Sequence, residues 1–124
     1  MALLESGENY LEVILRLSKK QTEIHAIDIV NDLGFSKPSV SIALKKLKDS
    51  GHIIIDGNSH ISLTDEGLKV ATKIFERHTI ITNLFLALGV SNATAEEDAC
   101  KIEHYLSEET FNAIKAHYLD KVQK

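Results

Sequence analysis

The spacing of apolar residues predicts three helices in the first fifty residues. Apolar side chains recur every three or four positions, as they do on one face of a helix, over about 7–17, 26–33 and 37–50. Gly34 and Gly51 suit the ends of the second and third helices, while Ser36 suits the N-cap of the third, with Pro38 in its first turn. The predicted inward positions are Tyr10, Val13, Ile14 and Leu17, then Ile27, Val30 and Leu33, and then Val40, Leu44 and Leu47.

The hydrophobic pattern changes its period after Gly51. Residues 52–55 are mostly β-branched and apolar, residues 60–63 alternate polar and apolar, and Asp56-Gly57-Asn58 between them is a turn sequence. This arrangement predicts a β-hairpin. Because the hairpin follows two short helices joined by a glycine-containing turn, we expect a winged helix-turn-helix.

The second half of the chain returns to helical spacing. Thr64 can cap a long helix that reaches about Leu88. Val90 to Asn92 lead into a further helix that contains residues 97–107, and a last helix is expected over about 107–122. His78 lies within the apolar stripe of the long helix, and a lone histidine there is more often a hydrogen-bonded core residue than a metal ligand. The predicted inward positions are Ala71, Ile74, Phe75, Ile81 and Phe85 in the long helix, and Phe111, Ile114 and Leu119 in the last one.

Composition and charge limit the possible functions. A chain of 124 residues that is 44% hydrophobic can form one compact unit or two small lobes. No apolar run has the length of a membrane span, no signal-peptide pattern is present, and one cysteine excludes an internal disulfide, so we expect a cytoplasmic protein with no membrane partner. The net charge of −4 means that any DNA binding must be local.

A local basic surface is present in the third predicted helix. Four lysines and no acidic residue lie between Ser36 and Lys48, and Ile42 sits among them on the face opposite the apolar stripe. An exposed isoleucine beside lysines suits a helix in a DNA major groove, although a generic lysine-rich helix would look similar. The predicted DNA-binding residues are Ser36, Lys37, Pro38, Ser39, Ser41, Ile42, Lys45 and Lys46, with Asn58, Ser59 and His60 of the wing.

Cys100, Glu103 and His104 are candidate metal ligands. On a helix their spacing of i, i+3 and i+4 places them on one face. Thiolate, carboxylate and imidazole are all ligands of divalent transition metals. The alternative is an ordinary buried cysteine beside a surface Glu–His pair.

From end to end the chain resembles the diphtheria-toxin-repressor family of metal-dependent transcriptional regulators, which includes the manganese transport regulators. The matching segments are residues 8–12 (ENYLE), 35–41 (FSKPSVS), 63–67 (LTDEG), 77–78 (RH) and 98–107 (DACKIEHYLS). The resemblance implies a homodimeric, metal-activated repressor of metal homeostasis that binds double-stranded operator DNA. It implies a mainly α fold with a small β-hairpin, in which residues 1–70 form the winged helix-turn-helix and residues 71–124 form a helical metal-binding and dimerisation domain. Neither an enzymatic activity nor a small organic ligand is expected.

The resemblance also implies a set of metal ligands. It implies that His78 is one of these ligands and not a hydrogen-bonded core histidine. Two positions differ between family branches: at Asn9 the iron branch tends to have Met and the manganese branch Asp, while Cys100 matches the iron branch and manganese regulators have Glu. Thr82 replaces a carboxylate of a second family site, and the chain ends without an SH3-like domain, as in the manganese regulators. We therefore predict Fe²⁺ or Mn²⁺, with Co²⁺ and Zn²⁺ as possible surrogates. The implied ligands are Asn9, Glu12, His78, Cys100, Glu103 and His104.

Two other functions fit parts of the pattern. A winged-helix regulator could ignore metal and respond to a small molecule or to redox change at Cys100. A small metalloenzyme could use the same donors, but the sequence offers no separate general base, nucleophile or substrate cleft.

Overall fold

The structure is a computed structural model that describes residues 5–123. It divides into two compact units, with the boundary between Lys73 and Ile74, inside α4. No helix within the described residues is long and apolar enough to cross a membrane. The elements are α1 (Glu5–Ser18), α2 (Ala26–Leu33), α3 (Lys37–Asp49), β1 (Ile53–Ile55), β2 (Ile61–Leu63), α4 (Asp65–Ala87), α5 (Asn92–Ile102) and α6 (Glu108–Gln123).

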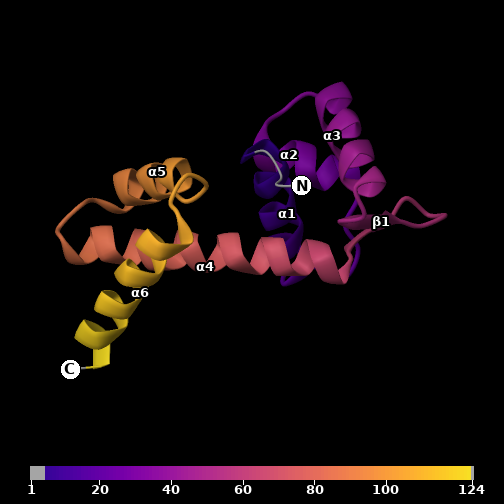
Figure 1. The fold of residues 1–124 in the computed structure, drawn as a ribbon. Helices are drawn as coiled ribbons and strands as arrows, with labels where there is room; N and C mark the ends of the chain where they lie inside the picture. The colour runs from indigo at the N-terminus through magenta and orange to yellow at the C-terminus, as the bar shows by residue number, and fades with distance from the viewer. Residues whose placement is uncertain (1–4, 124) are drawn as a thin grey trace. The chain divides into compact units, whose positions relative to one another are not determined.

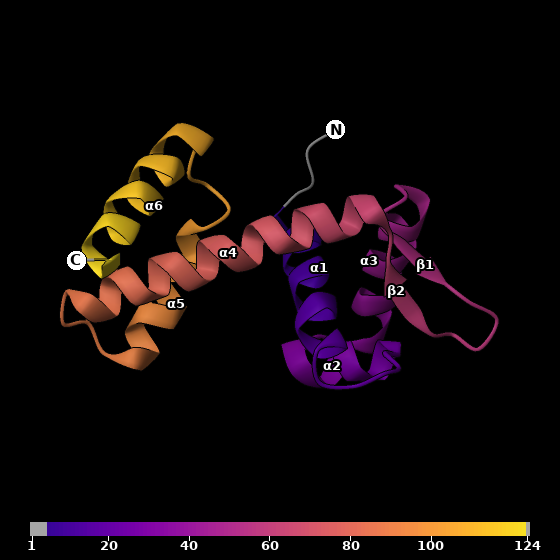
Figure 2. The same cartoon turned by 90° about the horizontal axis from the view of Figure 1, so that it is seen from below.

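The first unit is a winged helix-turn-helix, as the sequence predicts. Helix α1 contacts α2, α3 and β2, and α2 packs on α3 across the short turn between them. The strands β1 and β2 pair antiparallel with Ile53 opposite Leu63, and the hairpin extends away from the three helices (Figures 1 and 2). The described part of the chain is thus mainly α with one small β-hairpin, which confirms the predicted fold class.

The predicted helix ends are confirmed at three places. The Ser36 hydroxyl accepts a hydrogen bond from the Ser39 N–H (3.3 Å), which satisfies one of the free donors at the start of α3. Gly34 ends α2 in the left-handed conformation (φ 73°), which glycine adopts without steric cost. At the start of α4, Thr64 Oγ1 accepts a hydrogen bond from the Gly67 N–H (3.1 Å).

Gly67 is also required for packing between the wing and α4. A Cβ atom at this position would lie 2.0 Å from the backbone carbonyl oxygen of His52. That oxygen accepts a hydrogen bond from the Thr64 N–H (3.1 Å), so it cannot move away without breaking a contact. The glycine of the LTDEG segment therefore allows α4 to begin directly against the base of β1.

The core of the first unit contains most of the predicted inward residues. One prediction is wrong: Ile27 is 46% exposed, and Ile29 is fully buried in its place. Helix α2 is eight residues long and carries apolar residues at two overlapping helical stripes, so periodicity alone does not choose between them. The buried cluster is Tyr10, Leu11, Val13, Ile14, Ile24, Ile29, Val40, Leu44, Leu47, Ile53, Ile61 and Ala71.

In the second unit α5 and α6 flank the C-terminal half of α4 (Figure 2). Its small core consists of Ile80, Ile81, Ala99 and Phe111, with Phe85, Leu106, Ile114 and Tyr118 packed around it. Two sequence predictions need correction. Leu119 is 39% exposed, because α6 packs through Tyr118 instead. The helix expected to continue to residue 107 begins at Asn92 after the N-cap Ser91, close to the predicted start, but it ends at Ile102.

Candidate functional site

The candidate metal centre in the second unit is built on a buried carboxylate, Glu103. The Glu103 side chain has no exposed surface, and the side chain of His104 is 1% exposed. From α4, the His78 Nδ1 lies 2.9 Å from Glu103 Oε2. Because a carboxylate only accepts hydrogen bonds, Nδ1–H is the donor, and Nε2 carries the lone pair when the ring is neutral.

The second carboxylate oxygen of Glu103 lacks a hydrogen bond. Its Oε1 lies 3.4 Å from His104 Nε2, which is within ion-pair distance. The geometry is not that of a hydrogen bond, however, and no donor among the described residues satisfies this buried atom. Burying an unsatisfied carboxylate oxygen is costly, so the site favours an additional positive group.

The local fold explains how Glu103 comes to be buried. Its N–H donates to the Ala99 carbonyl (3.0 Å), so Glu103 continues the helical path by one residue and shares the buried face of Ala99. His104 lies beyond the helix, in a turn in which the Tyr105 N–H donates to the Ile102 carbonyl (3.1 Å). The expectation that a helix carries both Glu103 and His104 is therefore wrong, although both side chains are buried.

Arg77, next to His78 in α4, holds the backbone of this turn. Its Nη1 donates to the Glu103 carbonyl (2.9 Å) and to the Leu106 carbonyl (2.7 Å). The guanidinium carbon lies 5.1 Å from the ring centroid of Phe111, and the residue is only 4% exposed. Sequence reasoning missed this role, and its only signal was the position of Arg77 in the Arg-His segment of the family resemblance.

These donors fit a divalent transition metal. One buried carboxylate with an unsatisfied oxygen and two imidazoles supply the oxygen and nitrogen ligands that first-row divalent ions accept.

The other predicted ligands lie on α5 and α1. Cys100 is exposed on α5, one residue after the buried Ala99. Asn9 and Glu12 are half-buried residues of α1, in the first unit. The ligand roles of these three residues remain predictions. Thr82 is 8% exposed and lies one turn after His78, where the family's second site has a carboxylate.

The candidate DNA-binding surface lies on α3 and the wing of the first unit. Val40, Leu44 and Leu47 bury one face of α3, and the predicted DNA-binding residues occupy its exposed face. Ile42 is 59% exposed, although it is a large apolar residue. Its flanking residues Lys45 and Lys46 are also exposed, so this face presents positive charge and one apolar side chain together.

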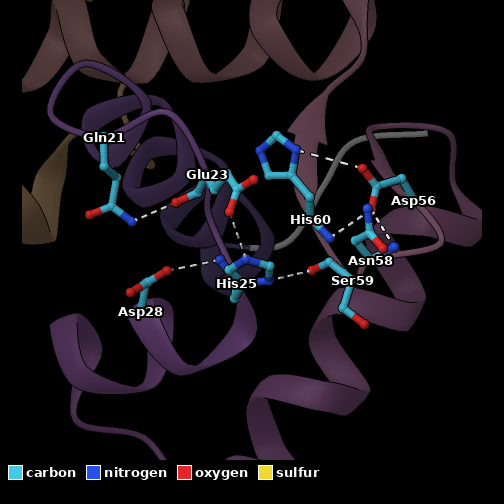
Figure 3. A network of polar contacts seen from close by, with 8 residues as sticks. All are labelled: Gln21, Glu23, His25, Asp28, Asp56, Asn58, Ser59 and His60. Carbon is cyan, nitrogen blue, oxygen red and sulfur yellow. Dashed lines mark hydrogen bonds and ion pairs between the residues drawn. The ribbon is translucent and has the colours of Figure 1, made fainter.

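The wing ends in a tight turn organised by Asp56 (Figure 3). Asp56 Oδ1 accepts hydrogen bonds from the His60 N–H (2.9 Å) and the Asn58 N–H (2.8 Å). These bonds stabilise the charged form, so the pKa of the Asp56 carboxyl is lowered from its ordinary value. Asn58 and Ser59 are exposed at this turn, and His60 is half-buried.

Known protein families match both halves of the chain. The N-terminal DNA binding domain of iron dependent repressors matches residues 2–61, and their metal binding and dimerisation domain matches residues 64–123. The chain belongs to the iron-dependent repressor family. It is therefore a metal-dependent, DNA-binding transcriptional regulator and not an enzyme.

Individual relatives of this family member are similar over most of its length. The transcriptional regulator MntR of Escherichia coli O6:H1 is 39% identical over 108 residues, which cover 87% of this chain and 70% of MntR. The iron-dependent repressor IdeR of Mycobacterium leprae is 27% identical over 108 residues, which cover 86% of this chain and 47% of IdeR. Among solved structures, the manganese regulator SloR superposes with a TM-score of 0.80 at 25% identity, over 94% of this chain and 54% of SloR. The chain thus spans about half the length of IdeR and SloR.

Proposed function

We propose that this chain is a homodimeric repressor that binds double-stranded operator DNA when Fe²⁺ or Mn²⁺ is bound at His78, Glu103 and His104. The observation that carries the proposal is the buried Glu103 carboxylate, which faces an imidazole on each side and has one unsatisfied oxygen. The names of similar proteins support the two metals, since IdeR is called iron-dependent and SloR a manganese regulator.

The full ligand set would include residues from three helices. We propose that Cys100 adds a thiolate from α5, and that Asn9 and Glu12 add oxygen ligands from α1. The support for Glu12 and Cys100 is their resemblance to family ligands. Asn9 occupies a further family ligand position, where its side-chain carbonyl could supply an oxygen in place of the Met or Asp of the two branches. A bound cation would supply the positive charge that balances the buried carboxylate of Glu103.

DNA binding would use α3 in the major groove. The lysines would neutralise phosphates, and Ile42 would contact thymine methyl groups. The chain's net charge of −4 makes this basic face the local site of attraction to DNA. The proposed contacts are Ser36, Lys37, Pro38, Ser39, Ser41, Ile42, Lys45 and Lys46 of the helix-turn-helix, and Asn58, Ser59 and His60 of the wing.

Metal binding would be coupled to DNA binding, although different parts of the chain carry the two functions. Residues 1–70 would bind DNA, and residues 71–124 would bind metal and form the dimer, so that bound metal fixes the spacing of two recognition helices. Coupling between two ligands is typically worth about 1–3 kcal/mol, or about 5–150-fold in affinity. Since operator DNA is the partner, we place this function in the cytoplasm.

Reciprocity gives the test of this proposal. If metal tightens DNA binding, DNA must tighten metal binding by the same factor. We would measure Mn²⁺ affinity by competition with a fluorescent indicator, with and without a duplex that the wild-type protein selects from a random pool. A factor of about 5–150 in both directions supports the proposal. DNA affinity that ignores Mn²⁺ and Fe²⁺ but changes when Cys100 is oxidised would overturn it in favour of a redox-responsive regulator.

A further inference from the structure

The wing is attached to the segment that precedes α2 by two hydrogen bonds. The Ile61 N–H of β2 donates to the Ile24 carbonyl (2.8 Å), and both of these isoleucines are 2% exposed. Two residues further along the wing, His25 Nδ1 lies 3.1 Å from the Ser59 carbonyl oxygen (Figure 3). The first bond fixes the buried base of the wing, and the second reaches its exposed turn.

The chemistry of the acceptor fixes the role of the His25 ring. A carbonyl oxygen cannot donate, so Nδ1–H of His25 is the donor. The other ring nitrogen, Nε2, lies 3.7 Å from Glu23 Oε2, and the ring of His60 lies 6.2 Å away between centroids. Both the neutral Nδ1–H form and the protonated imidazole can make the bond to Ser59.

Ser59 occupies a backbone conformation that needs support. Its φ of 63° is the only positive φ of a non-glycine residue in the described part of the chain. L-residues visit this region rarely, and they persist there when surrounding contacts hold them. The Ser59 N–H donates to the Asp56 carbonyl (3.0 Å), so Asp56 holds the turn from within the wing and His25 holds it from outside.

His25 also marks the start of the helix-turn-helix. Its backbone N–H donates to the Asp28 carboxylate (2.8 Å), one turn into α2, and α2 packs on α3. The same residue is therefore bonded through its backbone to the helix-turn-helix and through its side chain to the wing. A change of the side chain alone leaves the backbone bond to Asp28 available.

We propose that His25 is a positioning residue for DNA binding. By holding the Ser59 carbonyl, it keeps the wing turn in a fixed position relative to α2 and α3, so that Asn58 and Ser59 meet DNA in register with the recognition helix. The proposal rests on the proposed DNA-binding function. His25 is not among the metal ligands, so its effect on DNA affinity should be separable from metal affinity.

Three variants test this role. His25→Ala removes the donor, and His25→Asn restores one, because the asparagine amide nitrogen is as far from the backbone as Nδ1 and asparagine is a favourable N-cap. His117→Ala, at an exposed position of α6, is the matched histidine control. We would measure affinity for a duplex selected by the wild type from a random pool, at saturating MnCl₂, together with Mn²⁺ affinity and thermal stability.

We expect His25→Ala to bind the duplex about three- to tenfold more weakly, the loss that one hydrogen bond can produce. His25→Asn should recover most of this loss, and Mn²⁺ affinity should be unchanged in both. In the free protein, the amides of Asn58 and His60 should exchange faster in His25→Ala, because they are bonded within the turn that His25 holds.

Two results would overturn the inference. The first is a His25→Ala protein with the duplex affinity and amide exchange of the wild type. The second is His25→Asn being as weak as His25→Ala, since the restored donor would then have no effect. A wild-type protein that binds no duplex with MnCl₂ would instead overturn the proposed function. The amide exchange of the free protein would still decide whether His25 restrains the wing turn. Unchanged exchange in His25→Ala would exclude this restraint, and faster exchange would support it.

Discussion

The hydrogen bond between His78 Nδ1 and Glu103 Oε2, 2.9 Å long, joins the middle of α4 to the end of α5. It brings together two residues that are 25 positions apart in the chain, and it does so at a carboxylate with no exposed surface. The arrangement places the imidazoles of His78 and His104 next to a carboxylate that water does not reach. A divalent cation at this position would be stabilised by the charge of the Glu103 carboxylate.

Arg77 should affect metal affinity without being a ligand. Arg77→Lys keeps the charge but loses the planar donor geometry that holds the Glu103 and Leu106 carbonyls, so the turn with Glu103 and His104 should lose its position. We expect Mn²⁺ affinity to fall about 10-fold or more, as for other residues that orient metal ligands. The measurement is indicator competition at a temperature where melting curves show the variant to be folded.

Lys115→Ala is the control for this experiment. It removes a cation that lies 3.0 Å from Glu76, also between α4 and α6, at a partly exposed position. Its Mn²⁺ affinity should equal that of the wild type. If Arg77→Lys also binds Mn²⁺ like the wild type, the contacts of Arg77 with the turn do not position the ligands.

Lys45 and Lys46 should contribute to DNA affinity for every sequence. Both are exposed on the face of α3 that carries Ile42, and each phosphate contact contributes about 0.9 to the slope of log affinity against log salt. The double substitution to Ala should therefore lower the slope by nearly 2. Binding to specific and random duplexes is measured over a series of salt concentrations, and an unchanged slope would show that these lysines do not contact phosphates.

The stability of the first unit should depend on pH through Asp32. Arg16 donates two hydrogen bonds of 2.9 Å to the two oxygens of Asp32, and these bonds lower the pKa of the Asp32 carboxyl below its ordinary 3.8. A group whose pKa is lowered by folding stabilises the protein above its unfolded pKa, and this stabilisation is lost as the pH falls through the folded pKa. Asp32→Asn should therefore cost about 0.5–1 kcal/mol of unfolding free energy at pH 7, since the pair is partly exposed to water.

The difference in unfolding free energy between the wild type and Asp32→Asn should become smaller in acid. In urea titrations the difference between wild type and Asp32→Asn should be constant from pH 7 to pH 5 and should shrink below the ordinary pKa of the carboxyl. Glu96→Gln, at an exposed position of α5, should show no such difference. A difference that stays constant into acid would mean that the charge of Asp32 is not its source.

Much of the fold could be predicted because local signals and burial agree. Ser36, Thr64 and Gly34 lie at helix ends, where their side chains or backbone conformations are favourable. The turn sequence Asp56-Gly57-Asn58 predicts the hairpin. The errors in the predicted buried positions occur where two helical stripes compete. Ile27 and Ile29 are equally apolar, and only the packing of α2 on its neighbours decides which of them is buried.

The candidate site could be predicted in its residue types but not in its supporting contacts. Nothing in the sequence indicates that Arg77 is buried, because a charged residue reads as a surface residue until its carbonyl partners are placed. The bond of His25 to Ser59 joins positions 34 residues apart, and no periodicity links them. Both contacts depend on backbone carbonyl groups, whose location follows from the tertiary fold.

Cys100 should influence which metal activates the protein. A thiolate favours Fe²⁺, Co²⁺ and Zn²⁺ over Mn²⁺, which prefers oxygen ligands. We expect the wild type to respond to Fe²⁺ or Co²⁺ at a lower free concentration than to Mn²⁺, and Cys100→Glu, alone or with Asn9→Asp, to shift the balance toward Mn²⁺. DNA affinity is measured anaerobically in metal-buffered series, and a wild type most sensitive to Mn²⁺ would show that Cys100 does not set selectivity.

The central claim is that metal bound at His78 and Glu103 activates DNA binding, and the most direct test compares the wild type with His78→Ala. Duplex affinity is measured for both proteins against free Mn²⁺ and, anaerobically, free Fe²⁺. We expect metal to tighten duplex binding by the wild type by about 5–150-fold. His78→Ala should stay at the metal-free affinity, which the two proteins share because the DNA-binding residues are unchanged. Activation of His78→Ala at the same free metal concentration as the wild type would show that metal at His78 and Glu103 does not activate DNA binding.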